Sequence, residues 1–213
     1  VMSRQASEDR SALKRTYTLG IKLLTAISVP VAVAFTFMAE GLVLFLGGAE
    51  FMPAGAIALQ IMIWSIPIGW MNSLTQYALV AVDRQRTITW AFFLGVSFNI
   101  ITNLIFIPQF GYQAAAVTTI FSEAVLLIPF GVLIQHELGT LDWLDMIWRP
   151  VVASAAMGAV LLLGWPIAPV LALIVGAVVY PVVLLLLRPL SDSELTMLEP
   201  VLPGRVQRVL AIR

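Results

Sequence analysis

Residues 88–134 read ITWAFFLGVSFNIITNLIFIPQFGYQAAAVTTIFSEAVLLIPFGVLI, and this stretch decides the fold. Two apolar runs, 88–107 and 112–134, flank a short break at 108–111 that contains a proline and a glycine. Each run is about as long as the roughly 20 apolar residues that an α-helix needs to cross the hydrocarbon core of a bilayer. The stretch therefore predicts a hairpin of two transmembrane helices, the first of which stops at Pro108.

Similar apolar runs fill most of the remaining chain. Hydrophobic residues make up 60% of the 213 residues and charged residues only 11%, whereas about a quarter of a typical soluble domain is charged. Counting the hairpin, the runs predict an all-α polytopic membrane protein with six transmembrane helices, at residues 21–46, 54–82, 88–107, 112–134, 151–164 and 167–187.

The expected division of the chain follows from these runs. Residues 1–18 are polar and form a cytoplasmic lead-in, residues 19–188 form the transmembrane bundle, and residues 189–213 form a cytoplasmic tail. The longest internal loop is predicted at residues 135–146. Because the run at 151–164 is short for a span, residues 151–187 leave a re-entrant pair open as an alternative.

The positive charges predict the orientation. All twelve Lys and Arg residues lie in the predicted terminal and connecting segments on one side of the membrane. Cytoplasmic segments of membrane proteins carry an excess of these residues. Both termini are therefore expected on the cytoplasmic side of the cell membrane. Equal numbers of basic and acidic residues give no reason to expect a nucleic-acid partner. The cations are Arg4, Arg10, Lys14, Arg15, Lys22, Arg84, Arg86, Arg149, Arg188, Arg205, Arg208 and Arg213.

A family resemblance lies in residues 99–123, NIITNLIFIPQFGYQAAAVTTIFSE. An Asn-rich helix that ends in Ile-Pro, followed by a glycine turn that starts the next helix, resembles the polysaccharide biosynthesis and O-antigen flippases of the multidrug, oligosaccharidyl-lipid and polysaccharide exporter superfamily. The opening residues 1–4, Pro30, residues 47–51 and the pair Asp83-Arg84 are similar in order to other parts of these proteins. Ala114 departs from the small Gly-Ala-Ala step that usually follows the turn.

That resemblance implies an architecture and a function. Its members have two six-helix lobes around a cavity that opens alternately to either side, so the chain is expected to be the C-terminal lobe, with an N-terminal six-helix lobe as its partner. The expected function is transport of a polyprenyl-linked oligosaccharide to the outer leaflet, with no enzyme activity. The alternatives are a drug or metabolite exporter of the same superfamily and a non-transporting membrane assembly subunit.

Polar groups within the spans are the candidates for the substrate and ion pathway. Buried polar and ionisable groups are costly in a membrane and often mark such a path. They could bind sugar hydroxyls, and a carboxylate could couple transport to a proton or to sodium; no other cofactor and no metal are expected. The alternative is that the amides and hydroxyls only bridge helices. The candidates are Glu123, Asn103, Asn99, Asn72, Gln76, Glu40 and Thr119.

Pyrophosphate would need cations, and none lies in the middle of a predicted span. Lys22, Arg84 and Arg86 are candidates at the cytoplasmic mouth, unless these charges only set the topology. The sequence contains neither the Gly-x-Ser-x-Gly pattern of serine hydrolases nor the His-Glu-x-x-His pattern of zinc hydrolases. These absences favour a transporter over an enzyme.

Overall fold

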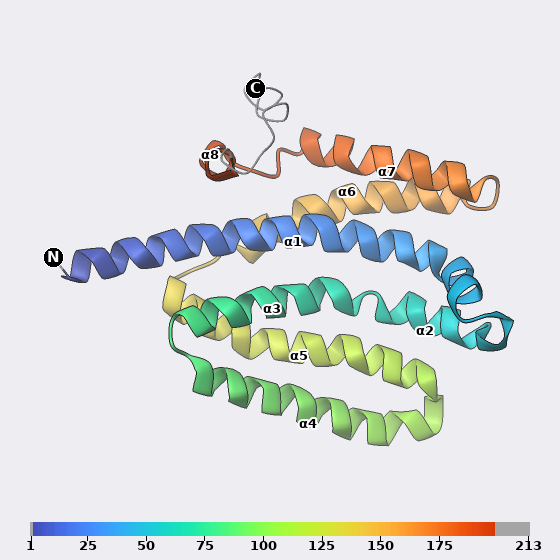
Figure 1. The fold of residues 1–213 in the computed structure, drawn as a ribbon, viewed down its shortest axis with the longest axis horizontal. Helices are drawn as coiled ribbons and strands as arrows, with labels where there is room; N and C mark the ends of the chain where they lie inside the picture. Colours follow the sequence, from blue (N-terminus) through green and yellow to red (C-terminus); the bar gives the residue numbers. More distant parts are fainter. Residues whose placement is uncertain (1, 199–213) are drawn as a thin grey trace.

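The computed structural model describes residues 2–198, and the regular secondary structure in this part of the chain is entirely helical (Figure 1). The all-α prediction is confirmed. The elements are α1 (Met2–Leu46), the 3-10 helix η1 (Ala49–Phe51), α2 (Ala54–Met62), α3 (Ser65–Ala81), α4 (Gln85–Phe110), α5 (Tyr112–Leu138), α6 (Trp143–Gly164), α7 (Pro169–Leu186) and α8 (Asp192–Leu198).

Five helices within residues 2–198 are long and apolar enough to cross a membrane by themselves: α1, α4, α5, α6 and α7. The consecutive helices α2 and α3 meet the same criteria together, with a bend of 41° between them. Counting this bent pair as one span gives the six that the sequence predicts.

Helix α1 is longer than a membrane requires. It has 45 residues and so a length of about 67 Å, against a hydrocarbon core of about 30 Å. The helix continues through residue 18, so the predicted lead-in forms the first turns of α1. Val1, the side chain of Arg4 and the tail from 199 to 213, with Arg205, Arg208 and Arg213, lie outside the described residues.

The predicted single helix at 54–82 is wrong in one respect, because it is broken between Met62 and Ser65. Pro67 has no N–H and cannot donate to the carbonyl of Ile63 one turn earlier. That carbonyl instead accepts the N–H of Ile66 at 3.2 Å, in a tighter turn. The break therefore lies one turn before the proline that causes it.

Helix α4 does not stop at Pro108 as predicted; it continues to Phe110. A proline in a membrane helix is tolerated where neighbouring groups satisfy the freed backbone. The end of the helix is set by Gly111, whose φ of 60° favours glycine, and whose N–H still bonds to the carbonyl of Ile107 at 2.8 Å. The turn between the two helices is therefore Gly111 alone.

The predicted loop at 135–146 is mostly helical. Helix α5 continues to Leu138 and ends at Gly139, which has a φ of 79°. Asp142 caps α6 by accepting the backbone N–H of Asp145 at 3.1 Å. With this earlier start, α6 has 22 residues and α7 has 18, so both are candidate spans and the re-entrant alternative is not observed.

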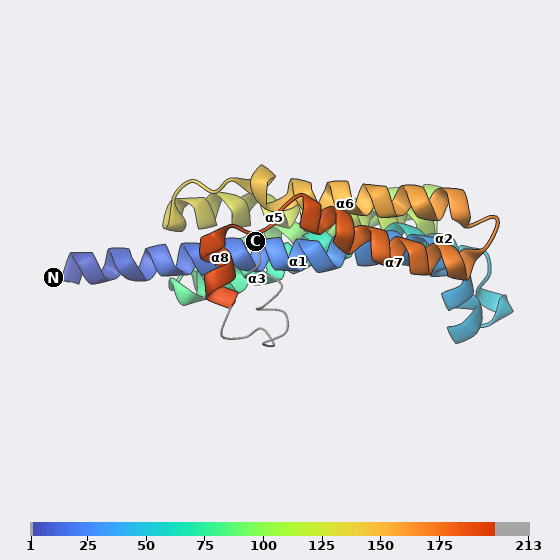
Figure 2. The same ribbon diagram turned by 90° about the horizontal axis from the view of Figure 1, so that it is seen from above.

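Helix α1 is the centre of the bundle. It packs on α3 on one side and on α6 on the other, while α4 packs against α5 and α7 against α6 (Figure 1, Figure 2). One hydrophobic core joins α1, α3, α4 and α5 around Tyr17, Leu79 and Phe130, and a smaller core joins α1, α6 and α7 around Met157 and Leu161. The hairpin of α6 and α7 is thus attached to the rest of the bundle mainly through α1.

A proline in α1 creates one of these attachments. Pro30 cannot donate to the carbonyl of Ala26, and the hydroxyl of Tyr180 in α7 donates to that carbonyl instead. In the same way, Pro150 leaves the carbonyl of Met146 without its helical donor, and Thr25 Oγ1 of α1 lies 3.4 Å from it. The Ala26 carbonyl is therefore satisfied by a hydroxyl from a neighbouring helix, whereas Thr25 has one hydroxyl proton and lies closer to the carbonyl of Ile21 in its own helix, at 2.8 Å.

Tyr180→Phe tests this arrangement. We expect it to lower the free energy of unfolding by about 1 kcal/mol, within the range measured for single interhelical hydrogen bonds in membranes. In a Pro30→Ala background the backbone N–H at position 30 can bond to the carbonyl of Ala26, so Tyr180→Phe should cost clearly less there. Equal losses in the two backgrounds, measured by reversible unfolding in mixed detergent, would contradict this pairing.

Candidate functional site

Glu123 on α5 and Asn72 on α3 form the centre of the candidate site. The Asn72 amide Nδ2 donates to Glu123 Oε2 at 2.7 Å and to the Glu123 backbone carbonyl at 2.9 Å. The carboxyl group lies against the backbone of Gly69, one turn before Asn72, where a Cβ atom would come within 3.5 Å of Glu123 Cδ. The acidic side chain of α5 therefore packs on α3 at Gly69, at a separation where a methyl group would still make an ordinary contact.

The two asparagines of α4 continue this polar region. Asn99 Nδ2 donates to Ser122 Oγ at 2.8 Å, and Asn103 Nδ2 donates to Asn99 Oδ1 at 2.9 Å. Ser122 in turn donates to the carbonyl of Thr118 at 2.7 Å. Polar residues from α3, α4 and α5 thus meet around one segment of α5.

A cavity of about 280 Å³ lies between α4 and α5 beside Glu123. Its polar lining comes from Asn99, Thr119, Ser122 and Glu123, and the remainder of its wall is apolar. Thr119 donates its hydroxyl proton to the carbonyl of Ala115 at 2.9 Å, so towards a ligand this oxygen can act only as an acceptor. Three of the predicted pathway residues therefore line one space, and Asn72 and Asn103 are hydrogen-bonded to two of them.

Gln76 and Glu40 are not brought to this cavity. Glu40 is exposed on α1 and Gln76 is half-buried on α3. Among the described residues, no hydrogen bond or ion pair links either side chain to Glu123, Asn72 or Asn99. Their predicted role in the pathway has no support from the geometry.

Two buried amide oxygens in this region have no hydrogen-bond donor among the described residues. Asn72 is only 3% exposed, and its Oδ1 has no hydrogen-bond partner among the described residues. Asn103 Oδ1 is buried without a partner as well. A carboxylate and unpaired amide oxygens are groups that can accept a proton, a sugar hydroxyl or a small cation.

Lys22, a predicted cation of the mouth, is 8% exposed and paired with two carboxylates. Its Nζ lies 2.9 Å from Glu194 Oε1 on α8 and 3.4 Å from Asp145 Oδ2 on α6. Burial raises the pKa of Glu194, but hydrogen bonds from Ser191 and Lys22 and the charge of Lys22 together outweigh it and hold that pKa below its ordinary value of 4.5. Lys22 therefore ties α1 to α6 and α8.

Arg84, the second of these cations, is bound to Glu137 at the end of α5. Its Nε and Nη2 lie 2.7 Å and 2.6 Å from Glu137 Oε1, and Arg10 Nη2 of α1 lies 3.4 Å from Oε2. The Glu137 side chain is only 5% exposed. Arg86 is exposed, and of the three predicted mouth cations it alone has no carboxylate partner in the part of the chain that the structure describes.

Glu137 is the residue whose importance sequence reasoning missed. Its neighbour His136 is 77% exposed, and the pair reads as an ordinary interfacial sequence. The ion pairs show instead that Glu137 joins the start of α1, the turn between α3 and α4 and the end of α5. Arg10, Arg84 and Glu137, together with Lys22, Asp145 and Glu194, define what we call the basic end of the bundle.

Comparison with known proteins supports the membrane assignment. The MatE family model matches residues 4–105, just under half of the chain. An uncharacterized membrane protein of Methanocaldococcus jannaschii is 28% identical over 125 residues, which are 57% of this chain but only 24% of that protein. The chain thus spans about a quarter of the length of this curated relative. No solved structure matches this chain.

Proposed function

We propose that this chain forms one lobe of an exporter in the cell membrane, and that the exporter moves a polyprenyl-linked oligosaccharide to the outer leaflet by alternating access. The MatE match over residues 4–105 supports a transporter, and the resemblance of residues 99–123 supports the lipid-linked substrate. The observation that carries the proposal is the cavity between α4 and α5 at Glu123. Such a polar cavity inside a bundle of membrane helices is costly and usually serves transport.

The residues at the cavity suit this substrate and its coupling. Amide and hydroxyl groups bind sugars through hydrogen bonds, and Asn99, Thr119 and Ser122 provide them. Glu123 can hold a proton or a sodium ion, because its carboxylate lies beside the unpaired Oδ1 of Asn72. Because Asn72 on α3 is hydrogen-bonded to Glu123 on α5, binding of a proton or a sodium ion at Glu123 would change how α3 packs against α5.

The volume of the cavity indicates that further protein is needed to complete a binding site for the substrate. Pockets for small molecules have volumes of about 300–1,000 Å³, so 280 Å³ is too small for an oligosaccharide. A larger space requires further protein, and the two-lobe architecture that the resemblance implies provides it. We therefore infer an N-terminal six-helix lobe as the partner of this chain.

The pyrophosphate of the substrate would have few free cations to meet on this lobe. Lys22 and Arg84 already neutralise buried or half-buried carboxylates, and a phosphate would have to displace them. Arg86 is exposed and lies in the first turn of α4. Arg86 and residues of the partner lobe are thus the better candidates for phosphate contacts.

Two other functions are alternatives that an experiment must distinguish from the proposed one. A drug or metabolite exporter agrees equally with the MatE match. A non-transporting assembly subunit would use its polar groups only as dry contacts between helices, and the Asn99–Ser122 and Asn103–Asn99 bonds are of that kind. Glu123 and Asn99, however, are only partly buried and line an open space, which favours a transport path.

Deletion of the gene, followed by complementation with the complete protein, tests the proposal. We expect the deletion strain to accumulate lipid-linked oligosaccharide in the cytoplasmic leaflet and to lose it from the outer leaflet, as measured by lectin labelling of intact and permeabilised cells. Unchanged glycan with increased sensitivity to toxic small molecules would instead indicate a drug exporter. Unchanged glycan and unchanged sensitivity would contradict transport of either class.

A further inference from the structure

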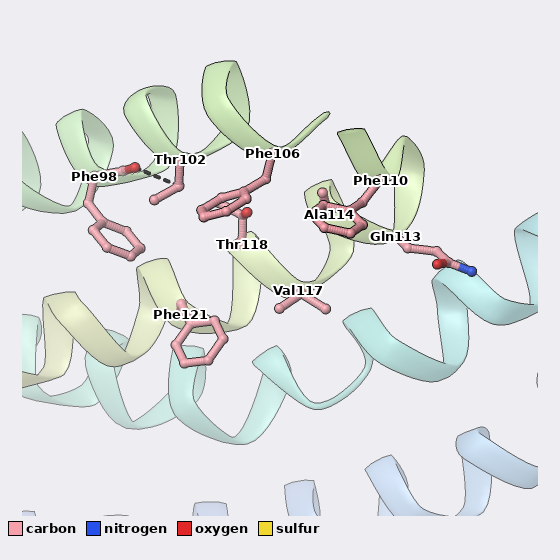
Figure 3. A pocket seen from close by; sticks show the side chains of 9 residues that line it. All are labelled: Phe98, Thr102, Phe106, Phe110, Gln113, Ala114, Val117, Thr118 and Phe121. Atoms are coloured by element: carbon pink, nitrogen blue, oxygen red, sulfur yellow. Dashed lines mark hydrogen bonds between the residues drawn. The ribbon is translucent and has the colours of Figure 1, made fainter. Parts of the chain in front are cut away.

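A second and larger hollow lies between α4 and α5 near the Gly111 turn, at the end of the bundle opposite the basic end (Figure 1, Figure 3). It has a volume of about 410 Å³ and is lined mainly by the aromatic rings of Phe98, Phe106, Phe110 and Phe121. We call it the phenylalanine groove. None of the residues with a predicted role in transport lines it.

The groove offers almost no polar group to a ligand. The hydroxyl of Thr102 donates to the carbonyl of Phe98 in its own helix at 2.7 Å, as the dashed line in Figure 3 shows. Gln113 lies at the turn end of the groove, apart from most of the phenylalanine rings (Figure 3). The sequence contains no charged residue between Arg86 and Glu123. Such a lining binds hydrocarbon and disfavours sugars and ions.

The groove is open on the surface of the bundle. Phe106, Phe110 and Phe121 are 42%, 60% and 57% exposed, and α4 and α5 are both candidate membrane spans. Helix α4 packs almost entirely on α5, so its remaining surface faces outward. In a bilayer the medium that reaches such an opening is lipid hydrocarbon.

We propose that the phenylalanine groove binds one acyl chain of a bilayer phospholipid. The absence of charge along the groove and at its turn end favours an ordinary phospholipid over a ligand that is selected by its headgroup. Each CH₂ group that moves from the loosely packed bilayer into the groove can gain dispersion contacts with the aromatic rings. The bound chain fills the space between α4 and α5 and holds the hairpin in one arrangement, whichever substrate the protein exports.

Photolabelling of the complete protein tests the proposal. The probe is a phosphatidylcholine with a diazirine in its acyl chain, at low abundance in phosphatidylcholine vesicles, and labelled peptides are mapped by mass spectrometry. We expect residues 98–121 to be labelled about tenfold more than the last turns of α7, which serve as the internal reference because Val178, Val182 and Leu186 are comparably exposed and lie outside the apolar hollow between α6 and α7. Equal labelling of both regions would overturn the proposal, because any exposed apolar surface would then suffice.

A pair of variants separates the groove from its surroundings. Val117 lines the groove and is 39% exposed, so Val117→Trp should fill it and remove most of the preferential labelling. Leu104, which is 72% exposed on α4 outside the groove, provides the matched control Leu104→Trp, for which labelling should persist. Persistent labelling in a folded Val117→Trp protein would contradict the proposal; if this variant does not fold, the comparison with α7 in the unchanged protein decides.

Two further outcomes identify another occupant. A phosphatidylglycerol with the same photoreactive chain should label residues 98–121 as strongly as the phosphatidylcholine does. A strong preference for either headgroup would overturn the assignment to an ordinary acyl chain. The same holds if lipid labelling is absent and a benzophenone residue introduced in place of Phe106, which lines the groove, crosslinks to another part of the protein, since the groove would then be covered by protein.

Discussion

Glu123→Gln is expected to reduce export by the complete protein on the order of 100-fold, the lower end of the effect of removing a group that transfers protons. Glutamine keeps the size of the side chain and its hydrogen-bond acceptor for Asn72, but it can neither release a proton nor carry the negative charge that would hold sodium. Initial rates of export from cells, at matched amounts of protein in the membrane, measure the effect.

Glu50→Gln is the matched control for this substitution. Glu50 is exposed in η1 and lies far along the chain from the residues of the cavity, so its neutralisation should leave the rate unchanged. Glu123→Asp should retain part of the activity, because it keeps an ionisable group near Asn72. Export by Glu123→Gln at the rate of the unchanged protein would show that the carboxyl group has no part in transport.

Arg84→Ala is expected to lower the free energy of unfolding by about 2 kcal/mol, less than the cost of breaking a fully buried ion pair, because the Arg84 side chain is 46% exposed. The Glu137 carboxylate would remain, 95% buried, with only the longer contacts to Arg10 at 3.4 Å and His136 at 3.5 Å. The loss would loosen the turn between α3 and α4, where Asp83 already has a φ of 59°. Reversible unfolding in mixed detergent measures the effect.

Two further variants identify the cause. Arg86 is an exposed cation two residues away, and Arg86→Ala should change stability by less than about 0.5 kcal/mol. The double variant Arg84→Ala with Glu137→Ala should recover much of the loss, because no buried carboxylate remains without its main partner. A double variant no more stable than Arg84→Ala would contradict the pairing.

The sequence predicted the number and order of the helices because the thickness of the bilayer sets their length. It failed at the ends of the helices and at one break, where single residues decide. Pro108 was expected to end α4, but a helix continues past a proline when the lost bond lies in its last turns. Residues 54–82 were expected to form one helix, whereas Pro67 causes a break between Met62 and Ser65.

The candidate site was only partly predictable, for a similar reason. Residues spaced one turn apart share a face of a helix, and this spacing groups Thr119 with Glu123 and Asn99 with Asn103, but it does not place one pair beside the other. The rotation of each helix against its neighbours is set by packing over the whole bundle, so the bond from Asn72 to Glu123 could not be derived. The pairing of Lys22 with Glu194 joins residues 172 positions apart, and no local pattern indicates it.

The central claim, that the cavity at Glu123 is a path for water and solutes within the membrane, is tested most directly by cysteine accessibility. These 213 residues contain no cysteine, so an introduced thiol is the only one in this part of the protein, and any cysteine elsewhere in the complete protein is first replaced by alanine. A charged methanethiosulfonate reagent should modify Thr119→Cys in the complete protein in native membranes and leave Ile128→Cys unmodified, because Thr119 lines the cavity and Ile128, although 67% exposed on the same helix, is not among the residues that line it. An unreactive Thr119→Cys, or equal reaction at the two positions, would contradict the claim.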